Sequence, residues 1–328
     1  MSRRRPALLL PGLASNVLIS SGTFLVAKRA LEEFPPLTLA LLRFCLATAL
    51  LWPSVRLLRR EKRIRPEDRG QMWWLGLLAV PLNQGLFLYG MKWASASHAA
   101  LLYALTPAFV VLFVTMSGGP RPTVRQVLGV AIAFAGVLTL LLQRGLHFDR
   151  HSVRGDLLVF LAVVAWAGYL LVGRGLTRRY GPLVVTSEAL LAGTLLYLPV
   201  GLAALPGFQP SAVSWVGWVG LFYLAWLTSG VNYVIWFWGL EHLKPGTVAM
   251  LTNVQPVVTA GMAWLFLREA LPAGFALSTA LVLGGVWLTR VGEAAVGPPA
   301  ASSTAEPAAP TLSASGGRGR ASDASPNP

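Results

Sequence analysis

The chain alternates between long apolar stretches and short polar or basic ones. Asp, Glu, Lys and Arg are absent from residues 6–27, 70–91, 245–267 and 270–289. A helix that crosses about 30 Å of hydrocarbon needs roughly 20 mostly apolar residues, so each stretch can span a membrane. The remaining spans are predicted at 34–55, 93–120, 126–143 and 157–173, with two more within 189–240. The pattern predicts an all-α integral membrane protein with ten transmembrane helices.

The basic residues gather on one side of this predicted bundle. If the N-terminus is cytoplasmic, most of the 27 Lys and Arg residues fall in cytoplasmic segments, with the densest cluster at 56–69. Cytoplasmic loops of membrane proteins carry such an excess. We therefore expect a multi-pass protein of the plasma or inner cell membrane with both termini in the cytoplasm. The cluster is interpreted as a topology determinant in contact with anionic lipid.

Two parts of the chain share one plan. A constant offset aligns Asn83 with Asn232, Gly90 with Gly239 and Pro107 with Pro256, and a slightly shorter one aligns Pro36 with Pro182. The sequence therefore predicts two five-helix repeats, residues 6–143 and 154–292. Because five is odd, the second repeat must enter the membrane from the opposite side. Inverted repeats of this kind occur in many secondary transporters.

The two five-helix halves also carry a resemblance to a known family. It lies in Pro36 and Arg43, in the spacings from Gly90 to Pro107 and from Gly239 to Pro256, and in Arg268 and Glu269, which follow the second spacing. In these features the chain resembles the EamA family of the drug/metabolite transporter superfamily. The resemblance covers roughly residues 10–292. It implies ten helices around a central cavity and, in many members, export of amino acids, other metabolites or drugs. The chain departs from the pattern at Pro120, where the first repeat has no acid to match Glu269.

Polar residues inside the predicted helices recur on single helical faces. Asn16, Ser20 and Thr23 are spaced by four and three residues, which places them on one face of the first helix. Polar groups that face lipid are costly, so these stripes should point inward. They serve either as interhelical hydrogen bonds or as the wall of a cavity for an amphipathic substrate. The cavity candidates are Asn16, Ser20, Thr23, Tyr103, Thr106, Trp166, Tyr169, Thr252 and Gln255.

Four further residues are matched between the repeats near the middle of their spans. Pro107 and Pro256 each remove a backbone hydrogen bond. In lipid the freed carbonyl must be satisfied by protein or by water in a cavity. A packing kink is the simpler reading, but the matched depth favours a gating or cavity role. The matched pair Asn83 and Asn232 is interpreted as structural or as part of a gate.

Two ionisable residues lie inside predicted spans. Arg43 should lie about 10 Å from the outer face and Glu188 about 9 Å from the cytoplasmic face, at 1.5 Å per residue. These opposite depths argue against a direct ion pair between them. Arg43 either attracts an anionic group such as a carboxylate or extends to the surface. Glu188 either binds a proton or a cationic group during transport or lies at the wet end of its helix.

Composition narrows the class of function. Of the 328 residues, 55% are hydrophobic and only 12% are charged, where a soluble domain carries about 25% charge. The net charge of +14 does not predict nucleic-acid binding, because no segment outside the termini would form a basic face. The single cysteine, Cys45, excludes a disulfide or a cysteine metal site within the chain.

These observations favour a secondary transporter that works by alternating access. We expect its substrates to be small metabolites, such as amino acids or amphipathic drug-like compounds, and its direction to be export. The expected partners are the substrate and the lipid bilayer; homodimerisation is left open, and no cofactor or metal is expected. No HExxH or GxSxG motif points to an enzyme. A receptor or assembly factor that does not transport is the principal alternative, followed by a membrane enzyme.

Overall fold

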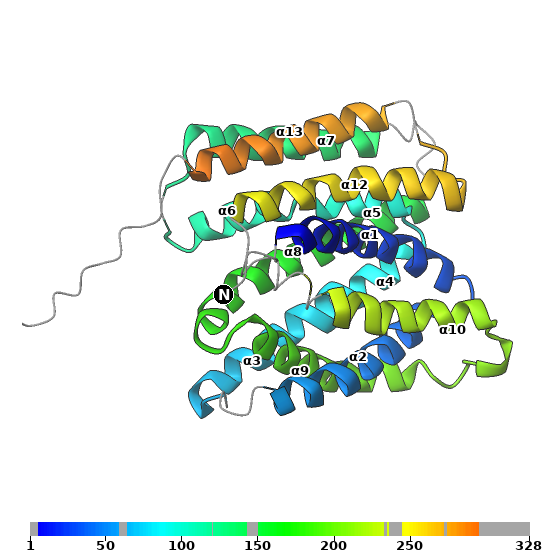
Figure 1. Ribbon diagram of the computed structural model, residues 1–328. Helices are drawn as coiled ribbons and strands as arrows, with labels where there is room; N and C mark the ends of the chain where they lie inside the picture. Colours follow the sequence, from blue (N-terminus) through cyan, green and yellow to red (C-terminus); the bar gives the residue numbers. More distant parts are fainter. Residues whose placement is uncertain are drawn as a thin grey trace, which may run out of the picture. The chain divides into compact units, whose positions relative to one another are not determined.

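Figure 1 shows the computed structural model of the chain, in which the elements of the described residues are all helices. The structure describes residues 6–58, 64–119, 121–142, 150–232, 235, 245–271 and 274–294. They belong to a single unit of the fold, Met1–Ala295. The composition of residues 293–328, rich in Ala, Pro, Ser and Gly, predicts a disordered cytoplasmic tail. This segment lies outside the described residues, apart from its first two, which complete the last helix.

In the first half of the chain the helices follow the predicted spans closely. They are α1 (Pro6–Ala30), α2 (Pro36–Leu58), η1 (Pro66–Asp68), α3 (Arg69–Leu77), η2 (Leu78–Gly85), α4 (Leu86–Met91), α5 (Ala96–Tyr103), α6 (Thr106–Met116) and α7 (Val124–Leu142). The segment η1 is a single 3-10 turn. Helix α3 continues without a break through η2, which is π-helical, into α4. Helices α5 and α6 together occupy the span predicted at 93–120.

Like the first half, the second half consists of α-helices, a 3-10 turn and a π-helical segment. They are α8 (Arg150–Tyr180), α9 (Pro182–Ala203), η3 (Pro210–Ala212), α10 (Trp215–Phe222), η4 (Tyr223–Val231), α12 (Pro245–Leu267) and α13 (Phe275–Ala294). Helix α10 runs directly into η4, which is π-helical like η2. Four described helices are long and apolar enough to cross a membrane: Pro36–Leu57, Ala96–Met116, Ser152–Tyr180 and Leu183–Ala203. Val124–Thr139, Trp215–Val231, Val254–Leu267 and Phe275–Thr289 are shorter apolar helices.

Local chemistry explains where several helices begin. Proline is favoured in the first turn of a helix because its missing N–H has no partner there, and Pro182 starts α9 in this way. It follows Gly181, whose φ of 82° ends α8 in a conformation that glycine adopts without strain. Ser95 caps α5 and Ser214 caps α10, each hydroxyl accepting a hydrogen bond from a backbone N–H of the first turn.

The two matched prolines lie in different local structures. Helix α5 ends at Tyr103, and Pro107 lies in the first turn of α6 after a short interruption. Pro256 lies inside the continuous helix α12. The proline of the first half therefore accompanies a helix break, whereas its counterpart is accommodated within one helix. A break of this kind allows α5 and α6 to take different directions.

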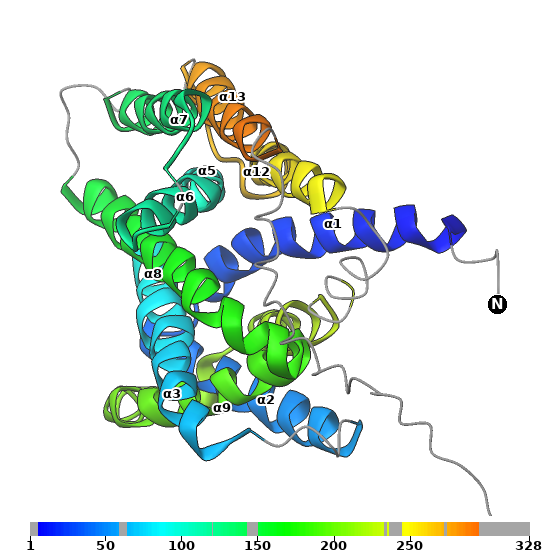
Figure 2. The same cartoon turned by 90° about the vertical axis from the view of Figure 1, so that its left-hand side faces the viewer.

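Glycines allow pairs of helices to pack with their backbones in contact. Helices α7 and α13 lie side by side in Figures 1 and 2. A Cβ on Gly285 of α13 would lie 2.5 Å from the carbonyl oxygen of Gly129 on α7. The same closeness occurs where α3 and α9 cross, because a Cβ on Gly193 would lie 2.5 Å from the Gly76 carbonyl oxygen. Small residues at such crossings are a common basis of helix association in membranes.

We expect Gly193→Ala to destabilise the protein by about 1–3 kcal/mol, the usual cost of overpacking a tight contact. The added methyl group would meet the backbone of Gly76 and the side chain of Val80, so α3 and α9 must separate. Gly175→Ala is the control, because a Cβ there has no neighbour within 4 Å and alanine is the better helix former. Unfolding midpoints in detergent measure both variants. Equal midpoints for the two variants would show that the crossing is not tight.

Candidate functional site

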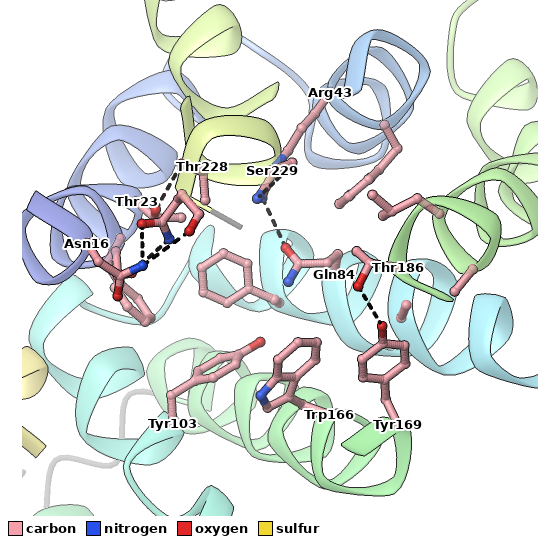
Figure 3. Close-up of a pocket in the computed structure, with 18 of the residues that line it drawn as sticks. Asn16, Thr23, Arg43, Gln84, Tyr103, Trp166, Tyr169, Thr186, Thr228 and Ser229 are labelled. Carbon is pink, nitrogen blue, oxygen red and sulfur yellow. Dashed lines mark hydrogen bonds between the residues drawn. The ribbon is translucent and has the colours of Figure 1, made fainter. Parts of the chain in front are cut away.

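A cavity of about 270 Å³ lies between helices from both halves of the chain. Its wall combines hydroxyl and amide groups with aromatic rings (Figure 3). The lining residues are Asn16, Ser20, Thr23, Phe24, Arg43, Phe44, Ala79, Gln84, Phe87, Tyr103, Trp166, Tyr169, Thr186, Ala189, Leu190, Thr228, Ser229, Asn232 and Gln255. Ligand sites commonly join a mainly apolar wall to a few placed polar groups, and this cavity has that character.

A cluster of amides and hydroxyls joins α1 to the end of η4 on one side of the cavity. Asn16 Nδ2 donates to Asn232 Oδ1 over 2.7 Å, and Asn232 Nδ2 donates to Ser20 Oγ over 3.0 Å. Thr23 and Thr228 share a hydroxyl hydrogen bond of 3.0 Å. These contacts satisfy polar groups inside an apolar bundle, where an unsatisfied group is costly. All five residues also line the cavity.

Arg43 projects from α2 toward both π-helical segments. Its side chain is only 3% exposed, so it does not extend to the surface. Nη1 donates to Gln84 Oε1 of η2 over 3.0 Å, and Nε donates to the Leu224 carbonyl oxygen of η4 over 3.2 Å. Ser229 Oγ lies 3.5 Å from Nη2. Arg43 therefore joins two π-helical segments. Because π-helical turns are frequent at functional sites, this part of the cavity is a candidate for ligand binding.

The hydrogen bonds of Arg43 continue into a buried amide group. Gln84 Nε2 donates to Asn83 Oδ1 over 2.6 Å. Asn83 Nδ2 in turn donates to Tyr103 Oη over 2.7 Å and to the Ala162 carbonyl oxygen over 2.8 Å. Asn83 is fully buried and does not line the cavity, so it acts as a support behind the wall.

Aromatic rings form the other side of the cavity. Trp166 and Tyr169 of α8 stack with ring centroids 5.0 Å apart and an interplanar angle of 11°. Phe24, Phe87 and Tyr103 meet edge to face with centroids 5.6–5.7 Å apart. Figure 3 shows Tyr103, Trp166 and Tyr169 in a row across the cavity from Thr23 and Ser229. Such rings offer a large rigid surface to an apolar or aromatic ligand.

The structure brings most of the predicted cavity residues together. Those that line the cavity are Asn16, Ser20, Thr23, Tyr103, Trp166, Tyr169 and Gln255. Thr106 does not line it, because its hydroxyl donates to the Tyr103 carbonyl oxygen at the helix break. The side chain of Thr252 lies outside the described residues. Pro107 and Pro256 are not part of the lining, whereas Asn232 and Arg43 are.

Glu188 lies apart from the cavity. Its carboxylate is 3.1 Å from Arg56 Nη2 and accepts a hydrogen bond from Trp52 Nε1 over 3.2 Å. Arg56 is half exposed, so this contact lies near the end of α2. The structure thus gives Glu188 a basic partner other than Arg43.

Several lining residues are not singled out by the sequence. Thr186, Thr228 and Ser229 are isolated polar residues within apolar stretches, and only their position in apolar spans distinguishes them. Gln84 follows Asn83 in the sequence, yet it is Gln84 that lines the cavity. Among the described residues no group of His, Cys, Asp and Glu side chains is arranged to hold a metal ion.

Three carboxylates join distant segments near helix ends. Glu269 accepts hydrogen bonds from the backbone N–H groups of Ala96 and Ser97, at 2.8 and 3.3 Å, and from the Ser97 hydroxyl at 2.9 Å. Glu33 likewise accepts from the Ser214 N–H and hydroxyl at 2.7 and 2.9 Å. These hydrogen bonds lower the pKa of the Glu33 carboxyl. A negative charge at a helix N-terminus also interacts favourably with the helix dipole.

The third carboxylate, Asp68, joins the segment before α3 to the end of α8. Tyr180 Oη donates to Asp68 Oδ2 over 2.6 Å, and Arg179 Nη1 donates to Oδ1 over 2.9 Å. The Tyr180 hydrogen bond, together with Arg179, lowers the pKa of the Asp68 carboxyl below its ordinary value of 3.8. A lowered pKa means that the ionised carboxylate is favoured in the folded protein.

We expect this contact to stabilise the protein at neutral pH and to fail in acid. The folded pKa of Asp68 is below its unfolded value, so its contribution is complete above the ordinary value and is lost as the pH falls through the folded pKa. The unfolding midpoint of Asp68→Asn should therefore lie below that of the wild type at pH 7. The difference should begin to shrink as the pH falls below about 4 and should vanish only below the folded pKa. Glu67→Gln, at the exposed neighbouring position, is the control. A difference that persists unchanged in acid would contradict this reading.

Comparison with known proteins agrees with this architecture. The sequence matches the EamA-like transporter family twice, over residues 10–142 and 153–291. An "Uncharacterized transporter" of Archaeoglobus fulgidus is 30% identical, covering 84% of this chain and 95% of that protein. A "Probable terminal-alkyne amino-acid exporter" of Streptantibioticus cattleyicolor is 28% identical, covering 69% and 75%. A solved crystal structure has the same fold, with a TM-score of 0.60 at 20% identity, covering 89% of this chain and 99% of the other.

Proposed function

Since this chain belongs to the EamA-like transporter family, we propose that it moves a small organic solute across a cell membrane by alternating access. It is a membrane transporter rather than an enzyme. The observation that supports the mechanism is the cavity, because both halves of the chain line it. The first half contributes α1, α2, η2, α4 and α5, and the second contributes α8, α9, η4 and α12. A solute bound there would touch both halves at once.

The arrangement we propose is a ten-helix inverted repeat, with residues 6–143 and 154–292 as its two halves and both termini in the cytoplasm. Three observations support it. The family matches the chain twice, at 10–142 and 153–291. Asn83 lies within the π-helical segment η2, and its counterpart Asn232 directly follows the π-helical segment η4. Gly136 and Gly285, at matched positions, both lie in the close contact between α7 and α13.

Alternating access requires contacts that break on each side in turn. In the proposed orientation, Glu33 and Glu269 hold helix ends on the outer side, and Asp68 holds Arg179 and Tyr180 on the cytoplasmic side. Each contact joins segments from different halves. The Glu33 contacts are exposed and the Glu269 contacts are part-buried, whereas Asp68 is buried. Polar groups at helix ends can take water as a partner instead, which suits a reversible gate.

The proposed substrates are small metabolites such as amino acids or amphipathic organic compounds, with export as the direction. The relative described as an amino-acid exporter supports the amino-acid class. The mixed wall of amides, hydroxyls and aromatic rings supports an amphipathic solute. A receptor that does not transport would bind such a solute without moving it, so a transport assay separates the two functions.

The test is uptake and counterflow in proteoliposomes with a panel of amino acids and amphipathic metabolites. We expect saturable uptake and faster exchange when unlabelled solute is present on the far side. Ala79→Trp fills the cavity without removing a side-chain hydrogen bond and should abolish transport. Ala131→Trp, on an exposed position of α7, should leave transport intact. Binding without saturable transport would favour the receptor, and equal activity of both variants would remove the cavity from the pathway.

A further inference from the structure

The charge of the cavity wall is informative about its ligand. Among the lining residues that the structure describes, Arg43 is the one charged side chain, and none is Asp or Glu. Glu188 directly precedes the lining residue Ala189 in the sequence, but its carboxylate contacts Arg56 and Trp52 and is not part of the lining. The wall therefore presents a positive charge to whatever enters. In a cavity of low polarity, this charge attracts an anion and repels a cation more strongly than it would in water.

The position of the guanidinium suits a carboxylate. Arg43 reaches the cavity between η2 and η4, with neutral oxygen acceptors at Gln84, Leu224 and Ser229 (Figure 3). The Ser229 contact is long at 3.5 Å, which makes it weak and easily exchanged. The planar guanidinium fork matches the two oxygens of a carboxylate, and such charge-assisted hydrogen bonds are stronger than those to neutral acceptors.

The rest of the lining limits the ligand further. A phosphate monoester would bring close to two negative charges to a wall with one cation, and buried charge without compensation is costly. On the side opposite Ser229, Trp166 and Tyr169 present stacked rings. A volume of about 270 Å³ accommodates a ring with a short chain, since a cavity of about 150 Å³ already binds benzene.

We propose that the cavity binds an amphipathic organic monocarboxylate, with its carboxylate at Arg43 and its apolar or aromatic body against Trp166 and Tyr169. This inference rests on the proposed transport function and makes it more specific. A bound carboxylate would take the place of Ser229 Oγ, the long contact of the guanidinium. Occupancy would thereby act on the contact that Arg43 makes between η2 and η4.

The test compares four probes of one size and shape with the purified full chain in nanodiscs at pH 7.4. They are 3-phenylpropionate, 3-phenylpropan-1-ol, 3-phenylpropan-1-amine and L-phenylalanine, and calorimetric titration gives each dissociation constant. We expect the carboxylate to bind at least about tenfold more tightly than the alcohol, and the amine to bind most weakly. An alcohol, amine or zwitterion that binds as tightly as the carboxylate would overturn the proposal, as would no binding of the carboxylate at millimolar concentration.

Variants then locate the preference. In Arg43→Gln the ratio of carboxylate to alcohol affinity should fall to about one, with alcohol binding retained. Arg56→Gln removes a cation outside the lining and should leave the ratio unchanged. Trp166→Ala should weaken the carboxylate and the alcohol alike. A preference that survives in Arg43→Gln would overturn the assignment. If Arg43→Gln does not fold, the relative affinities of the four probes for the wild type still decide whether the cavity prefers a carboxylate.

The failure of this inference is distinguishable from failure of the proposed function. Saturable counterflow of L-phenylalanine in proteoliposomes, with no advantage for 3-phenylpropionate, would refute the monocarboxylate and leave transport standing. Absence of saturable transport for every solute in the metabolite panel would refute the proposed function itself.

Discussion

Replacing Asn83 with leucine should destabilise the protein by about 3 kcal/mol, a change of more than a hundredfold in the folding equilibrium. Asn83 is fully buried, and its amide joins three segments of the bundle. It donates to Tyr103 Oη and to the Ala162 carbonyl oxygen, and it accepts from Gln84 Nε2. Leucine has a similar size but offers none of these contacts, so Tyr103 Oη and the Ala162 carbonyl oxygen each lose a donor and the Gln84 amide loses an acceptor.

The measurement is the free energy of unfolding of Asn83→Leu in mixed micelles, from a titration with denaturing detergent. Thr139→Val is the control, because its hydroxyl donates only to its own helix at an exposed position, and we expect a change below about 0.5 kcal/mol. Hydrogen bonds between membrane helices average only about 0.6 kcal/mol when both partners can adjust. A loss near that value for Asn83→Leu would show that the surrounding groups find new partners.

The second large effect is expected at the start of α5. In Glu269→Ala the exchange of the Ala96 and Ser97 amide hydrogens with solvent should become at least about tenfold faster. Both N–H groups donate to the Glu269 carboxylate, and hydrogen bonds to a charged group contribute about 1.5–3 kcal/mol. Without this acceptor the first turn of α5 has unsatisfied donors and should open more often.

Hydrogen exchange followed by mass spectrometry on peptides covering residues 94–103 measures this change. Arg268→Ala is a closely matched control. Arg268 directly precedes Glu269 in the same loop and has a φ of 53°, and its replacement leaves the contacts of Glu269 in place. We expect exchange in this control to stay at the wild-type rate. Equal acceleration in both variants would mean that the loop conformation, rather than the carboxylate, protects α5.

The helices and the inward-facing polar stripe of α1 are predictable from the sequence for a physical reason. Apolar length and the 3.6-residue period depend only on neighbouring residues, so spacing alone places Asn16, Ser20 and Thr23 on one face. These three residues line the cavity together. The same periodicity, however, does not distinguish Thr106, whose hydroxyl is used at the helix break after α5.

Other features depend on contacts between distant segments and are not visible in local patterns. The direction of Arg43 is set by acceptors on Gln84 and Leu224, which lie about 40 and 180 residues away in the chain. The π-helical segments η2 and η4 are not recognisable from local sequence patterns. The wider turn of a π-helix is stabilised by the side chains of other helices that pack around it. Likewise, Glu269 suggests an acid near a helix end, but its partner Ala96 follows only from the fold.

The inverted arrangement of the two halves is tested most directly by labelling matched positions from one side of the membrane. Cys45 is the single cysteine, so Cys45→Ala provides a background without cysteine. Lys92→Cys and Glu241→Cys occupy equivalent positions in the two repeats. A membrane-impermeant maleimide applied to intact cells should label Lys92→Cys and should label Glu241→Cys only after lysis. Labelling of both positions from the same side would contradict the inverted repeat and the alternating-access mechanism built on it.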